Sequence, residues 1–145
     1  MGSECYYYYV PYENDKNNAL QKLREREFGA GRYNPAMSFP FSSDDQPPGK
    51  QHATIEDAIR AAEEDGTRSI LDLVGVSGDD YFCTARVPGT DELNQYFGTD
   101  KPTKALVEEH FNDFAAKIER GKGLCITVYE GDKPDELFFV GYSFD

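Results

Sequence analysis

The sequence predicts an α+β fold in which about four helices pack on a mixed or antiparallel sheet. Three observations support this class: two apolar runs near the C-terminal end that are typical of a β-hairpin, helical patterns that are interspersed with strand-like runs, and a length of 145 residues, which suits one domain. We therefore expect a single α+β domain over residues 1–145.

The C-terminal hairpin is the most strongly specified element. Its runs Leu124–Tyr129 and Leu137–Tyr142 are apolar and aromatic, and the turn-forming residues 131–135 between them predict a loop of several residues. Both faces of both runs are largely apolar, which is typical of strands that are covered on two sides. The hairpin is therefore expected to lie in the core.

The N-terminal third predicts a strand, a helix and an irregular segment. Residues 5–10 include four consecutive tyrosines and favour a strand. A helix is expected over residues 14–28, with Asn14 as its N-cap and Gly29 as its stop. The segment 38–53 is rich in Pro, Ser, Asp and Gly, so we expect it to be irregular and either mobile or functional.

The middle of the chain predicts a helix, two strands joined by a turn at residues 77–80, and two further helices. A helix from Thr54 is expected to end at Asp65-Gly66, and the other elements are predicted over 69–76, 81–87, 90–97 and 103–120. The last of these helices has the clearest apolar stripe. His110 falls within that stripe, so we expect a buried, neutral imidazole.

The charge balance narrows the classes of partner. Acidic residues number 27 against 15 basic ones, giving a net charge of -12. Nucleic acid and anionic membranes are therefore disfavoured, whereas a basic protein or a cation would be attracted. The same charge also keeps a protein soluble without any partner. No run approaches the ~20 apolar residues of a membrane span, and no signal peptide is evident, so we expect a cytoplasmic protein of undetermined oligomeric state.

The sequence offers no metal or cofactor motif. Cys5, Cys83 and Cys125 lie far apart without paired spacing, so we expect free, reduced thiols. The two histidines, His52 and His110, do not stand in a ligand pattern. We therefore expect no metal and no cofactor, and we assign no catalytic residue.

The loop that follows the first predicted helix is the most site-like stretch. Its two glycines can turn backbone amides toward a ligand, and the Arg32 guanidinium can meet a carboxylate or phosphate with two parallel hydrogen bonds. His52, in the irregular segment, could serve as a base. The candidate ligand-binding residues are therefore Arg32, Tyr33, Asn34 and His52. The alternative interpretation is a glycine helix stop followed by a turn.

The chain resembles two groups of proteins. The stretches 28–35, 65–72 and 136–145 resemble those of small, uncharacterised bacterial proteins of about this length, and this resemblance implies no function. The order of Gly31-Arg32-Tyr33-Asn34-Pro35 and the alanine-rich segment 53–62 resembles toxin-type domains of the ADP-ribosyltransferase superfamily. The match lacks an Arg or His on the first strand and an obvious late acidic partner.

Two functions remain open from the sequence. The charge and the tyrosines favour a protein-binding module, for example an inhibitor of the immunity or antitoxin type, with a basic protein as its partner. The alternative is an enzyme or binder that acts on a nucleotide such as NAD, with Arg32 holding phosphate and Tyr33 stacking on a ring. A pocket beside Arg32 would favour the second function.

Overall fold

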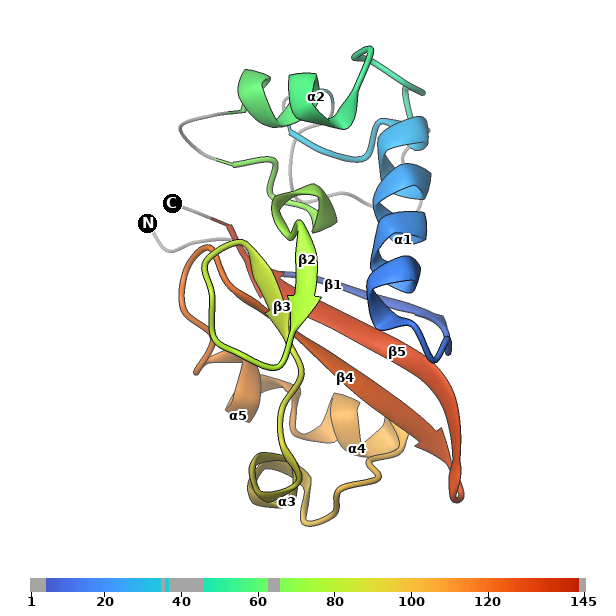
Figure 1. Cartoon of the computed structure of the whole chain (residues 1–145), viewed down its shortest axis with the longest axis vertical. Helices are drawn as coiled ribbons and strands as arrows, with labels where there is room; N and C mark the ends of the chain where they lie inside the picture. The colour runs from blue at the N-terminus through green and yellow to red at the C-terminus, as the bar shows by residue number, and fades with distance from the viewer. Residues whose placement is uncertain (1–4, 35, 37–45, 63–65, 144–145) are drawn as a thin grey trace.

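A five-stranded mixed sheet organises the chain in the computed structural model, which describes residues 5–34, 36, 46–62 and 66–143. The strand order is β1-β5-β4-β3-β2 (Figure 1). The β1/β5 and β5/β4 pairs are antiparallel, and the β4/β3 and β3/β2 pairs are parallel. The bounds are Cys5–Pro11 for β1, Gly75–Ser77 for β2, Thr84–Arg86 for β3, Gly123–Glu130 for β4 and Lys133–Tyr142 for β5.

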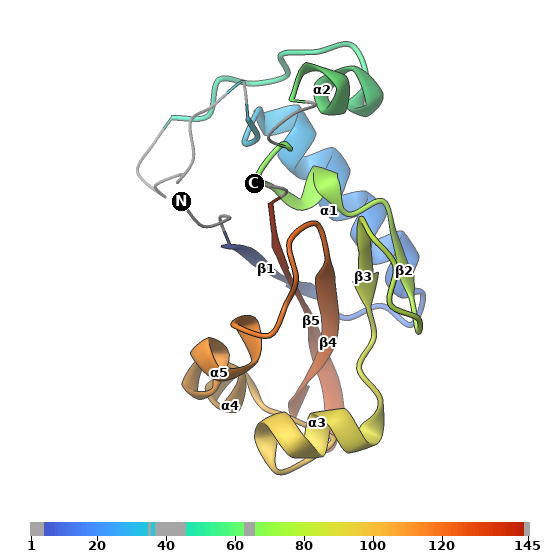
Figure 2. The ribbon, with the colours of Figure 1, turned by 90° about the vertical axis from the view of Figure 1, so that its left-hand side faces the viewer.

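Helices flank this sheet on two sides. Figures 1 and 2 show α1, α2 and the short 3₁₀ helix η1 on one side of the strands, and α3, α4 and α5 on the other. Their bounds are Lys16–Ala30 for α1, Ile55–Ala61 for α2, Ile70–Asp72 for η1, Thr90–Phe97 for α3, Lys104–Glu109 for α4 and Phe111–Ala115 for α5. The predicted α+β class is confirmed, and of the two sheet types that the sequence allowed, mixed or antiparallel, the mixed one is present.

The hairpin β4–β5 separates two hydrophobic clusters. Leu137 and Phe139 belong to the cluster that also contains residues of α1, α2 and η1, whereas Phe138 and Val140 belong to the cluster with residues of α3, α4 and α5. All four side chains are fully buried. Successive side chains of a strand point to opposite faces, so this burial requires cover on both faces, as the sequence predicted.

The hairpin loop is shorter than the sequence predicted. The strands end at Glu130 and begin again at Lys133, so that the turn consists of Gly131, with φ 64°, and Asp132. The prediction was wrong because a proline, which normally interrupts strand pairing, is accepted here at position 134. A register irregularity between Val128 and Tyr129 accommodates Pro134, which has no N–H to donate to a regular ladder.

Helix α1 begins one residue later and ends two residues later than predicted. Its N-cap is Asp15, whose carboxylate accepts from the Asn18 N–H at 3.0 Å, rather than Asn14. Its stop is Gly31, with φ 78°, rather than Gly29. Glycine is required at Gly31 because a Cβ atom there would lie 2.3 Å from the Gly49 carbonyl oxygen.

The predicted irregular segment 38–53 lies only partly within the described residues. Residues 46–53 contain no helix or strand, and residues 38–45 lie outside the described part of the chain. The second predicted helix ends at Ala61, before its expected stop at Asp65-Gly66, of which Asp65 is also outside the described residues.

The predicted strands 69–76 and 81–87 shorten to β2 and β3, which pair in parallel. The physical reason for the first change is Asp72, whose buried carboxylate accepts hydrogen bonds from the Thr67 N–H and hydroxyl and from the Arg68 N–H. Such side-chain bonds to nearby backbone compete with a ladder, and they hold residues 70–72 in η1. Cys83, with φ 58°, interrupts the second predicted strand.

The predicted helix 103–120 divides at His110 into α4 and α5 and ends at Ala115. The His110 side chain is 33% exposed and lies near the carboxylates of Glu109 and Asp113, so the predicted burial was wrong. Apolar residues every three or four positions do not distinguish one helix from two short ones. The break sets Phe111 against Tyr7, with ring centroids 5.1 Å apart.

The two-sided burial of the hairpin predicts a large cost for Phe139→Ala. The change removes a fully buried ring, which typically costs about 3 to 5 kcal/mol of unfolding free energy. Urea denaturation followed by circular dichroism measures this loss. Tyr81→Ala is the matched control, because Tyr81 is 58% exposed and its loss should change the unfolding free energy by less than about 0.5 kcal/mol. Equal losses in the two variants would contradict the assignment.

Candidate functional site

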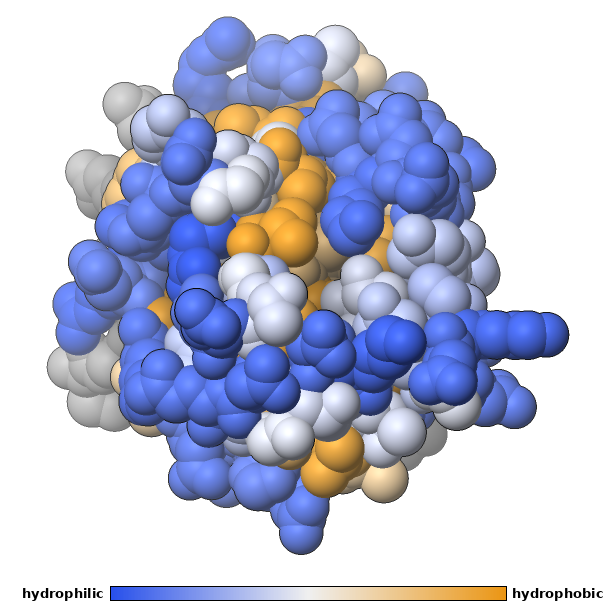
Figure 3. Space-filling view, turned by 60° about the horizontal axis from the view of Figure 1, so that its bottom comes forward, coloured by the Kyte–Doolittle hydropathy of each residue, from blue (hydrophilic) through white to orange (hydrophobic). Residues whose placement is uncertain are grey.

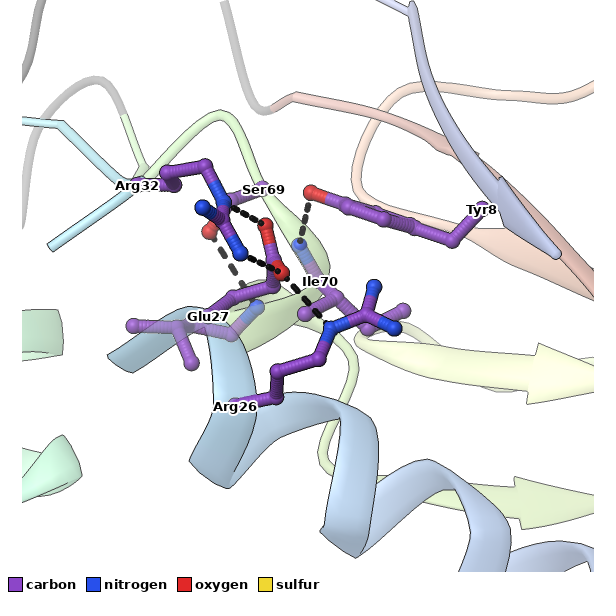
Figure 4. A network of polar contacts seen from close by, with 7 residues as sticks. Tyr8, Arg26, Glu27, Arg32, Ser69 and Ile70 are labelled. Carbon is purple, nitrogen blue, oxygen red and sulfur yellow. Dashed lines mark hydrogen bonds and ion pairs between the residues drawn. The ribbon is translucent and has the colours of Figure 1, made fainter. Parts of the chain in front are cut away.

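The predicted site loop is tied to α1 by a buried carboxylate. Glu27, on the last turn of α1, is nearly buried and accepts two hydrogen bonds from the Arg32 guanidinium, at 2.9 and 3.0 Å (Figure 4). Arg26 adds a third hydrogen bond at 3.0 Å from its Nε. Arg32 therefore makes a bidentate contact with a carboxylate of its own chain, whereas the sequence analysis expected such a contact with a ligand. This contact raises the pKa of Arg32, so the guanidinium stays charged.

The structure brings the side chains of Tyr33 and His52 together. The Tyr33 hydroxyl lies 2.6 Å from Nδ1 of His52, and the Tyr33 ring is fully buried against Phe28, with centroids 5.9 Å apart. Burial raises the pKa of Tyr33. The ring is thus held in the core and its hydroxyl positions the imidazole.

Asn34 makes its hydrogen bonds to a different segment of the chain from Arg32 and Tyr33. Its backbone N–H donates to the Thr67 carbonyl at 2.8 Å, and its side-chain amide donates to the Gly66 carbonyl at 3.4 Å. Asn34 therefore joins the loop to the segment before η1. Each of the four candidate side chains, Arg32, Tyr33, Asn34 and His52, has a contact within the chain. Their ligand-binding roles stay predictions.

Removing the Arg32 guanidinium should destabilise the fold. Arg32→Ala leaves the nearly buried Glu27 charge with only the half-exposed Arg26, and an unsatisfied buried acceptor costs about 1 to 3 kcal/mol. Chemical denaturation at neutral pH measures the loss. Arg60→Ala is the control, because Arg60 pairs with Asp57 at the exposed surface, where such pairs contribute about 0 to 1 kcal/mol. An unchanged midpoint for Arg32→Ala would show that Glu27 does not depend on this contact.

A second candidate site lies where α4 and α5 meet strand β1. We call it the aromatic pocket, a cavity of about 270 Å³ lined by Tyr7, Tyr9, Glu108, Phe111, Asn112 and Phe138. The fully buried Phe138 ring lies 4.7 Å from the Tyr9 ring and 6.1 Å from the Tyr7 and Phe111 rings, measured between centroids. Tyr7 is 56% exposed, so the pocket is open to solvent at that ring.

Strand alternation explains why these tyrosines share the pocket. Tyr6 and Tyr8 belong to or pack against the cluster on the α1 side, whereas Tyr9 packs against the cluster on the α4 side. Tyr7 shares the face of Tyr9 because side chains two positions apart lie on one face of a strand. The four consecutive tyrosines therefore divide into a core pair and a pocket pair.

Charged groups of both signs lie at the aromatic pocket. The Lys104 Nζ lies 4.3 Å from the centroid of the Tyr9 ring, so this ring already accepts a cation on one face. The Glu108 carboxylate lines the pocket. Desolvation, with the charges of Glu108 and Glu136 as smaller causes, raises the pKa of Tyr9 to about 12, so its hydroxyl stays neutral at physiological pH.

The cysteines contribute no strong nucleophile. All three are free; Cys125 is buried, and Cys5 and Cys83 are partly buried. Burial raises the pKa of Cys5 to about 11 and that of Cys125 to about 12, so both remain thiols at neutral pH, and thiols are much weaker nucleophiles than thiolates. In the part of the chain that the structure describes, no three His, Cys, Asp or Glu residues gather as a metal site would require.

Comparisons with protein-family models, curated proteins and solved structures found no match. The two resemblances drawn from the sequence therefore stay predictions. Among the described residues, no helix combines the length and the hydrophobicity that crossing a membrane requires. The surface shown in Figure 3 is mostly hydrophilic, with hydrophobic residues gathered mainly in one band, in keeping with the charged composition of the chain.

Only part of the aromatic pocket can be predicted from the sequence. The tyrosines of residues 6–9 stand out, but the apolar stripe predicts Phe111 as a core residue of one long helix, and no motif gives Glu108 a role. The sequence signals that could have indicated the pocket are a tyrosine-rich strand and an apolar helix with an acidic residue, Glu108, three positions before Phe111. Which face of that helix meets which strand depends on the break at His110.

Proposed function

We propose that this chain is a binding module for a basic protein, and that the aromatic pocket takes up a lysine or arginine side chain of that partner. The observation that carries the proposal is the pocket itself, in which four aromatic rings and the Glu108 carboxylate line one cavity. Ring faces and a carboxylate both attract cations. The net charge of -12 would steer a basic partner toward the molecule.

The nucleotide alternative has less support from the contacts. Stacking on a nucleotide ring needs an open ring face, and the Tyr33 ring is fully buried. Gripping phosphate needs the paired donors of Arg32, and Nε and one terminal nitrogen of Arg32 already bond to Glu27. An inhibitor of a basic enzyme is one kind of protein that fits the proposed function.

Peptide binding tests the proposal. The probe is a fluorescent dodecapeptide of alternating lysine and valine, and the matched probe alternates glutamate and valine. We expect the lysine peptide to bind in an anisotropy titration and the glutamate peptide not to bind. Association should slow as salt is raised, because charges are screened over about 10 Å at 0.1 M ionic strength. Equal affinity for both peptides would refute the proposal.

Two single-charge variants separate the pocket from the overall charge. Glu108→Gln should weaken binding of the lysine peptide about two- to fivefold, as expected for loss of an exposed charge contact. Glu25→Gln removes the same charge from an exposed position on α1, on the other side of the sheet, and should change binding much less. Equal effects of the two variants would mean that the peptide binds to the general acidic surface and not to the pocket.

A further inference from the structure

Strand β1 is an edge strand with an unusual composition. It pairs with β5 on one side, and no other described backbone segment pairs with it. Its residues 5–10 carry no charged side chain, and only Pro11 at its end is a residue that blocks strand pairing. Long edges without charges are the edges that recruit a further strand. The opposite edge, β2, has only three residues.

The register fixes which amides of β1 face outward. The Tyr12 N–H donates to the Asp135 carbonyl at 3.1 Å, and this pair continues the register in which Tyr8 faces Phe139. In an antiparallel ladder, hydrogen-bonded pairs alternate with pairs that do not bond to each other. Tyr8 and Tyr12 therefore bond toward β5, whereas the N–H and C=O groups of Tyr7 and Tyr9 point toward the open edge.

These outward amides belong to the two tyrosines that line the aromatic pocket. A residue that pairs with Tyr7 on an added antiparallel strand would place its side chain on the same face as the Tyr7 ring. That side chain would enter the pocket beside Glu108. The backbone edge and the cation pocket are thus parts of one surface.

We infer, building on the proposed function, that the basic partner binds as an extended segment that adds to β1 as an antiparallel sixth strand, with a lysine or arginine opposite Tyr7 or Tyr9. Backbone bonds then supply affinity and the pocket supplies selectivity for a basic residue. A second copy of this chain is a poorer occupant. It would bring another net charge of -12 to the edge, and its own β1 offers only uncharged side chains to the pocket over residues 5–10.

Backbone methylation of the peptide tests strand addition. In the alternating peptide the lysines face the pocket, so their N–H groups are the ones that bond to Tyr7 and Tyr9. N-methylation of two central lysines should weaken binding about tenfold or more, whereas N-methylation of two central valines, whose N–H groups point away, should have little effect. On binding, hydrogen exchange should slow at the Tyr7 and Tyr9 amides and not at those of Tyr6 and Tyr8.

The outcomes separate this inference from the proposed function. If both methylated peptides weaken equally, or only the valine-methylated peptide weakens, antiparallel pairing with a lysine opposite Tyr7 or Tyr9 is refuted, while a selective effect of Glu108→Gln would still support the cation pocket. If the unmodified lysine peptide does not bind, the proposed function fails first. If the Tyr7 amide gains protection with protein concentration alone and sedimentation shows a dimer, a second copy occupies the edge and the inference is overturned.

Discussion

The hairpin of β4 and β5 must be covered on both faces, and the rest of the fold follows from this constraint. Leu137 to Val140 are all fully buried, with alternate residues in two separate clusters. One layer of helices could shield only half of these side chains, so α1 and η1 pack on one face and α3 to α5 on the other. In this sheet β5 lies between β1 and β4, and β1 is an edge strand.

The loop after α1 shows how a motif that looks like a ligand site can serve the fold. Glu27 is nearly buried, and a buried carboxylate is tolerated only when it is paired and hydrogen-bonded. Arg32 meets this need because Gly31 turns the chain back toward the helix end. A glycine turn followed by an arginine suggested a phosphate-binding site. The same two features are what a buried carboxylate at a helix end requires.

The sequence predicted the elements whose burial is two-sided, and it failed where individual side-chain contacts decide the bounds of an element or where residues far apart in the chain meet. The two strands of the hairpin and α3 follow from local composition and turn residues, although the loop of the hairpin is shorter than predicted. The shortening of β2 depends on Asp72, whose burial brings its carboxylate to the backbone of Thr67, and that of β3 on the positive φ of Cys83. The pocket combines residues about a hundred positions apart, and no local pattern relates Tyr7 to Glu108.

The aromatic pocket lies at the edge strand β1, so its tyrosine rings are accessible to a partner. An aromatic cluster inside a domain contributes packing alone, but Tyr7 and Tyr9 stand on the rim strand, where their rings and their backbone groups both meet solvent. An acidic molecule with such an edge risks pairing with copies of itself, and like charge opposes that contact. The same charge favours a basic strand. If the proposed function holds, the net charge would select basic chains for an edge whose backbone hydrogen bonds alone would not discriminate between chains.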